Sequence, residues 1–87
     1  MPAIYVLDVP EFRSLVRVAA KVAEYSVNEL PGGYFRIESQ REIVFSRKEL
    51  GFKPAVWYGC LTGGLRGQIA QFDRDMLRIV DVDRVQT

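Results

Sequence analysis

The sequence predicts an α+β fold in which one amphipathic helix, at about residues 9–27, packs on a five- or six-stranded, mainly antiparallel sheet. Three observations support this prediction: an apolar run at 3–7, helix-start signals directly after it, and several short β-rich segments separated by turn residues in the rest of the chain. The expected order is a strand, one helix and then strands. The alternative is a small bent barrel that the helix caps.

The length and composition limit the possible classes of protein. A chain of 87 residues is expected to form a single domain, residues 1–87, because it is too short to bury two cores. Its 48% of hydrophobic and 26% of charged residues are typical of globular proteins, and a net charge of +1 gives no strong field for gathering polyanions. No apolar run approaches the ~20 residues of a membrane span, and no signal-peptide pattern opens the chain. A cytoplasmic location without a membrane partner is therefore expected.

The first strand and the helix have the clearest local signals. Residues 3–7 are apolar without alternation, as in a strand buried on both faces at the centre of a sheet. Asp8 as N-cap and Glu11 three residues later form a capping-box pattern, and Pro10 suits the first helical turn. The helix is expected to end near residues 26–28, before a Pro-Gly-Gly sequence.

The later strands are predicted from alternating or continuous apolar residues. They are expected at 34–38, 42–46, 55–62, 68–72 and 76–82. The first two of these form a predicted hairpin, and so do the last two, which are joined at 73–75 and turn Leu77 and Ile79 inward. Residues 55–62 are apolar on both faces, which predicts a second central strand.

The two doubly apolar strands, at 3–7 and 55–62, imply a sheet face that one helix does not cover. Either the sheet curls into the barrel, helped by glycines at its bends, or a second copy of the chain packs against it. A homodimer is the expected solution, because cyclic dimers are the commonest oligomers.

Six candidate ligand-binding residues follow residue 56. They are Trp57, Tyr58, Gly63, Gly64, Arg66 and Gly67. The backbone N–H groups of a glycine-rich turn and a nearby guanidinium can bind a small phosphate or carboxylate. The turn matches neither the dinucleotide-binding fingerprint nor a P-loop, so a small anion site competes here with a plain β-turn.

Basic and aromatic residues interleave in the middle of the chain, among them Tyr34, Arg36, Trp57, Tyr58 and Arg66. Arginines beside stacking aromatic rings on a sheet are typical of proteins that bind single-stranded nucleic acid. Binding of single-stranded nucleic acid or a small anion, through a basic and aromatic sheet face and the glycine turn, is therefore an alternative function.

The residues of common catalytic and metal sites are largely absent. The chain contains no histidine, and Cys60 is its single cysteine, which argues against a zinc site and against a histidine-activated nucleophile. No metal ligand and no cofactor is expected, and Cys60 is interpreted as an inert buried thiol.

The opening stretch from Met1 to Leu7, followed by an amphipathic helix, resembles the start of tautomerase-superfamily proteins. In that family, removal of the methionine frees a proline amine that acts as a general base. The resemblance implies Pro2 as a catalytic residue. It covers the first quarter of the chain and assigns the family's substrate-binding arginine to no position here.

These patterns together predict a small soluble binding or accessory module, acting as a homodimer on a ligand that the sequence does not identify. A non-enzymatic role is favoured over an enzyme, because the enzyme alternative depends on Pro2 alone.

Overall fold

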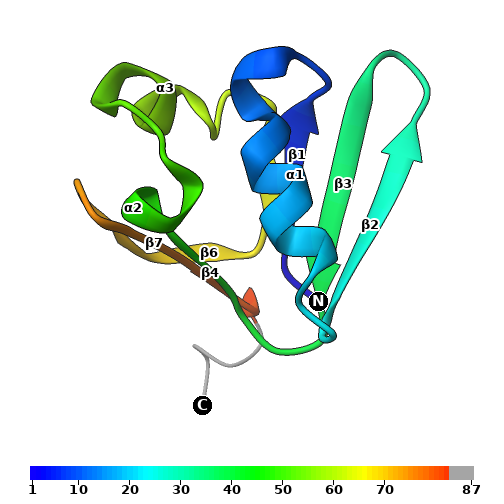
Figure 1. The fold of residues 1–87 in the computed structure, drawn as a ribbon. Helices are drawn as coiled ribbons and strands as arrows, with labels where there is room; N and C mark the ends of the chain where they lie inside the picture. Colours follow the sequence, from blue (N-terminus) through cyan, green and yellow to red (C-terminus); the bar gives the residue numbers. More distant parts are fainter. Residues whose placement is uncertain (83–87) are drawn as a thin grey trace.

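The computed structural model describes residues 1–82, which form an α+β fold with seven strands in two antiparallel sheets and three short helices (Figure 1). The α+β class is confirmed, whereas the prediction of a single five- or six-stranded sheet is wrong. Each sheet has an open linear strand order, so the described strands do not close into the alternative barrel.

The four-stranded sheet A has the order β2 (Tyr25–Leu30), β3 (Tyr34–Ser39), β1 (Ala3–Leu7) and β5 (Leu65–Arg66). The three-stranded sheet B has the order β4 (Ile43–Ser46), β7 (Met76–Val80) and β6 (Gln68–Phe72). The helical segments are a 3-10 turn η1 (Pro10–Phe12), α1 (Arg13–Ala20), α2 (Arg47–Leu50) and α3 (Pro54–Gly59). In Figure 1, α1 lies over sheet A and the strands of sheet B run across those of sheet A.

The buried side chains form one cluster that draws on both sheets and on the helices. β1 lies between β3 and β5, which confirms it as an inner strand. Leu15 and Ala19 bury the apolar side of α1 in this cluster, and the hairpin of β6 and β7 contributes Leu77 and Ile79, both completely buried as predicted. The apolar residues of this one helix face and of the two sheets therefore share a core.

The predicted helix at 9–27 is wrong in its second half, because α1 ends at Ala20 and β2 begins at Tyr25. Residues 25–30 alternate between half-buried and exposed positions over most of their length, and they pair with β3. The Pro-Gly-Gly sequence is the turn of this hairpin, with Gly32 and Gly33 at φ values of 88° and 81° that suit glycine. The turn residues that were interpreted as a helix stop therefore connect two strands.

The predicted capping box at the helix start is also wrong. The residues that precede η1 and α1 are Val9 and Phe12, and neither makes a side-chain cap. The backbone N–H of Asp8 donates to the carbonyl of Gly33 at 2.8 Å, which ties the end of β1 to the hairpin turn. Pro10 does occupy the first turn, as expected.

The predicted central strand at 55–62 is wrong, because Pro54–Gly59 is the helix α3. Pro54 stands at the start of this helix, where its fixed φ is favourable and its missing N–H costs nothing. Trp57 and Cys60, three residues apart, are buried, whereas Tyr58 is 51% exposed. This helical spacing removes the second doubly apolar strand, and with it the original reason for expecting a dimer.

The segments at 34–38 and 42–46 are strands, but their predicted hairpin is wrong. β3 pairs with β1 and β2, whereas β4 pairs with β7 in the other sheet. The connection contains no glycine or Asn-Gly pair of the kind that closes a tight hairpin, and the Ser39 hydroxyl accepts from the backbone N–H of Arg41. The chain therefore passes from sheet A to sheet B at this point.

Tyr25 joins the two sheets through its side chain. Its hydroxyl accepts from the backbone N–H of Val44 at 2.8 Å and donates to the carbonyl of the same residue at 3.2 Å. The ring packs edge-on against Phe45, and burial raises the pKa of the hydroxyl. The β2 edge of sheet A is in this way fixed to the β4 edge of sheet B.

Candidate functional site

The glycines of the predicted anion-binding turn lie against neighbouring backbone. A Cβ atom on Gly63 would overlap the carbonyl oxygen of Tyr5, and the carbonyl of Gly64 accepts from the Tyr5 N–H at 3.0 Å. Gly67, at φ 119°, lies so close to the carbonyl of Val80 that a Cβ would come within 2.6 Å of it. The N–H of Gly64 donates to the carbonyl of Leu61, so it is not presented to an anion. These glycines permit close packing of the turn on β1 and β7.

Arg66 forms part of a charged cluster on the outer face of sheet A. Its guanidinium lies 2.9 Å from one carboxylate oxygen of Glu38. Arg36 Nε lies 3.1 Å from the other oxygen, but its N–H is not aligned for a hydrogen bond. The register places Tyr5 opposite Arg36, and Tyr34 falls on the same face two residues away. The structure thus brings Tyr34, Arg36 and Arg66 together, but Glu38 between the two arginines offsets one of their charges. Binding of nucleic acid or an anion on this face stays a prediction.

The structure separates the two aromatic candidates. Trp57 is completely buried, and its indole N–H donates to the carbonyl of Asp73 at 2.7 Å. Tyr58, the next residue of α3, is half-exposed, with its ring 5.6 Å from that of Phe72. Trp57 therefore fixes α3 to the turn between β6 and β7, and Tyr58 remains available at the surface.

Pro2, the catalytic candidate that the tautomerase resemblance implies, has a buried side chain. Its carbonyl accepts from the N–H of Ser39 at 3.2 Å, and the terminal ammonium of Met1 lies 3.1 Å from Asp81. While Met1 is present, the Pro2 nitrogen is an amide and cannot act as a base. Catalysis by Pro2 stays a prediction that depends on removal of Met1.

Cys60 is buried near the end of α3, and burial raises its pKa from 9.0 to about 11. A thiolate is therefore disfavoured, which is the opposite of what a nucleophile needs. The thiol is suited to packing in the core rather than to chemistry.

The raised pKa of Cys60 predicts a loss of stability at high pH. The unfolded thiol ionises near pH 9, whereas the folded one keeps its proton up to about pH 11, so its contribution is complete below pH 9 and disappears as the pH rises toward 11. Between about pH 8 and about pH 10 this amounts to about 1 kcal/mol. Urea unfolding at both pH values measures it, with Cys60→Ala as the control that should lose this component. An equal pH dependence in both proteins would contradict the assignment.

A groove between the start of α1 and sheet A could hold a small ligand. It has a volume of about 450 Å³, within the range of small-molecule sites. Its lining consists of Leu7, Asp8, Val9, Phe12, Arg13, Val16, Arg17, Glu29 and Phe35. We refer to this hollow as the α1 groove.

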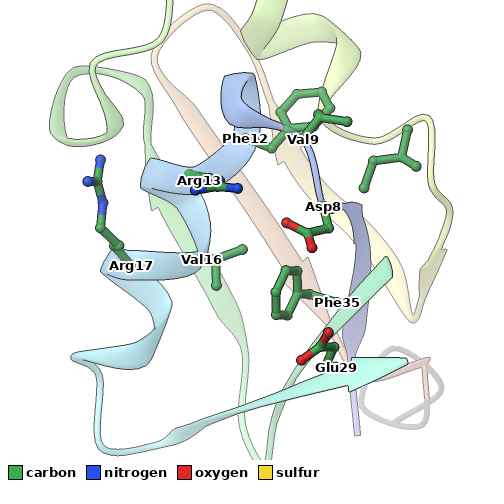
Figure 2. A pocket seen from close by; sticks show the side chains of 9 residues that line it. Asp8, Val9, Phe12, Arg13, Val16, Arg17, Glu29 and Phe35 are labelled. Carbon is green, nitrogen blue, oxygen red and sulfur yellow. The ribbon is translucent and has the colours of Figure 1, made fainter. Parts of the chain in front are cut away.

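Local sequence patterns explain how the α1 groove forms. Leu15 and Ala19 pack α1 against the core. Phe12 and Val16, which are four residues apart and each adjoin Leu15 in sequence or on the helix surface, therefore line the groove. Glu29 and Phe35 are cross-strand partners of β2 and β3 and therefore share one face of sheet A. Figure 2 shows Val16 and Phe35 on opposite sides of the groove, one from the helix and one from the strand.

The four charged residues of the α1 groove come from two sides. Arg13 and Arg17 belong to α1, whereas Asp8 follows β1 and Glu29 lies on β2. Within residues 1–82 none of the four forms an ion pair. In Figure 2, Asp8 points into the groove and Arg13 lies beside it, while Arg17 extends away from the other side chains. The apolar side chains among its lining residues form what we call the apolar floor. The groove thus combines this floor with charged side chains of both signs that form no ion pair in the described chain.

The α1 groove was not predicted from the sequence. The residues of β2, which supplies Glu29, were predicted to be helical. The available signal was the alternation of apolar and basic residues at 12, 13, 16 and 17, which places an apolar stripe next to a basic one on the helix.

Among residues 1–82, no group of three or more histidine, cysteine or acidic residues could hold a metal ion. In the same part of the chain, no helix has the length and hydropathy needed to cross a membrane.

Comparison with known proteins found no matching family model and no matching curated protein.

Proposed function

We propose that this protein is a small binding module and that its ligand site is the α1 groove. The observation that carries the proposal is the pairing of an apolar floor with charged side chains of both signs that make no ion pair among themselves. A ligand with an apolar body and its own opposite charges complements such a site. The buried thiol of Cys60 is compatible with a reducing compartment, and we place the module in the cytoplasm.

The ligand class that fits best is an aromatic or large apolar amino acid, free or at the end of a short peptide. Its side chain would lie on Val16 and Phe35, its ammonium group near Asp8 and Glu29, and its carboxylate near Arg13. A guanidinium–carboxylate contact is a strong, charge-assisted hydrogen bond, and the aromatic floor adds contact area. For so small and open a site we expect a Kd of roughly 0.1–1 mM, which corresponds to about −5 to −4 kcal/mol.

Titration of ¹⁵N-labelled protein with L-phenylalanine tests the proposal. We expect shifts of backbone amides at residues 8, 9, 11–17, 29 and 35. N-acetyl-L-phenylalanine amide has the same ring without either charge. It should bind at least about tenfold more weakly than L-phenylalanine. Equal binding of both compounds would show that the groove binds the ring but that the charged side chains do not contribute. The absence of shifts at these positions would contradict the proposed site.

Two arginine variants provide a matched comparison for the same titration. Arg13→Gln is expected to raise the Kd for L-phenylalanine about tenfold, because it removes a charge-assisted contact. Arg17→Gln removes the same charge from the same helix four residues later, but its side chain points away in Figure 2, so a change of about twofold or less is expected. Equal effects of the two substitutions would show that net charge, and not the groove geometry, determines binding.

A further inference from the structure

The edges of the two sheets differ in how well they are protected against pairing with another strand. β5 has two residues, and the backbone N–H and carbonyl of Val44 on β4 are both bound by the Tyr25 hydroxyl. β2 carries the exposed Glu29 and ends directly before Pro31, and a charge or a proline on an edge disfavours strand addition. Three of the four edges are therefore protected.

The fourth edge, β6, lacks charges and prolines over its five residues, Gln68–Phe72. Within residues 1–82 it pairs with β7 on one side, and no strand pairs with its other side. Ile69 is the cross-strand partner of the buried Ile79 but is itself 43% exposed. Tyr58, on α3, extends this apolar surface next to Phe72. This edge combines backbone groups that no other strand of residues 1–82 pairs with and exposed apolar side chains.

The sequence of β6 is complementary to a second copy of itself in the antiparallel direction. A twofold arrangement can place Ile69 of one copy opposite Phe72 of the other, since both side chains face the core side of sheet B. The same direction brings the Arg66 end of one strand to the partner's turn at residues 73–75, where Asp73 forms no ion pair within residues 1–82. The bulge between Ile69 and Gln71 shortens the regular stretch, so the contact is small and weak.

We propose that two copies of this protein associate through antiparallel pairing of β6, which joins their two copies of sheet B into one six-stranded sheet. This interface uses none of the residues of the α1 groove, so it is independent of the proposed ligand site. The sequence led us to expect a dimer because one sheet face was thought to be uncovered. The present proposal is based instead on the open edge of β6.

Sedimentation velocity between about 10 µM and about 1 mM tests this proposal, because a weak interface gives a concentration-dependent mass. We expect the wild-type protein to shift from monomer toward dimer over this range. Ile69→Lys places a charge on the edge and should raise the dissociation constant at least about tenfold. Asn28→Lys, which adds the same charge to the exposed, already protected β2 edge, is the control and should associate like the wild type.

Hydrogen exchange of the wild-type protein gives a second measurement that needs no variant. The β6 amides should exchange more slowly at high than at low protein concentration, while the β2 amides should not change. A wild-type protein that stays monomeric up to about 1 mM overturns the proposal. A dimer that Ile69→Lys leaves intact, or in which the β6 amides show no added protection, overturns the β6 interface while leaving self-association in place.

Discussion

Gly63→Ala is expected to lower the free energy of unfolding by about 3 kcal/mol, a large part of the roughly 4–13 kcal/mol typical of a domain of this size. The new methyl group would overlap the carbonyl oxygen of Tyr5, and the ring of Tyr34 lies close on the same side. Backbone cannot rotate away as a flexible side chain can, so the turn must move off β1 and lose the hydrogen bond between Tyr5 and Gly64. Urea unfolding monitored by Trp57 fluorescence measures this loss.

The matched control for this substitution is Gly59→Ala. Gly59 is the last residue of α3, has no positive φ, and has open space where a Cβ would be placed. Alanine there is expected to be neutral or to stabilise the protein by up to about 1 kcal/mol, because it restricts the unfolded chain and favours the helix. If the two alanine variants unfold at the same urea concentration, the close packing of the glycine turn on β1 is wrong.

Trp57→Ala is expected to cost about 3–5 kcal/mol, the range for removing a large aromatic side chain from a core. Trp57 is completely buried, packs its ring 5.6 Å from that of Phe72, and donates its N–H to Asp73. The substitution leaves a cavity and an unsatisfied carbonyl at the same place. Thermal unfolding followed by far-ultraviolet circular dichroism measures the effect without needing the indole as a probe.

Tyr58→Ala is the control for Trp57→Ala, because it removes a large aromatic residue from the next position of the same helix. Tyr58 is half-exposed, so its loss at low protein concentration is expected to cost about 1 kcal/mol or less. Similar costs at both positions would favour a strand buried on both faces over the helix at 54–59.

The elements that the sequence predicted well are those whose patterns are local. β1 is a continuous apolar run, and the hairpin of β6 and β7 alternates around a turn in which Asp73 accepts from the backbone N–H groups of Asp75 and Met76. Such patterns depend on neighbouring residues, so one sequence is enough to read them.

The errors arose where distant contacts decide the structure. Residues 55–58 favour a strand by composition, but α3 forms because Trp57 and Cys60 enter the core together, and a helix puts them on one side. Residues 25–30 continue the preceding pattern, but pairing with β3 makes them a strand. The α1 groove depends on this second error, since Glu29 reaches the groove through β2. The candidate site could therefore not be predicted from patterns within single segments.

An isotope-filtered NOE experiment on labelled protein with bound L-phenylalanine tests the α1 groove most directly. We predict contacts from the ligand ring protons to the methyl groups of Val9 and Val16 and to the ring of Phe35, because these side chains line the apolar floor. Contacts instead to Tyr5 and Tyr34, on the outer face of sheet A, would place the ligand elsewhere and contradict the proposed site. The absence of any ligand contact at saturating concentration would contradict it as well.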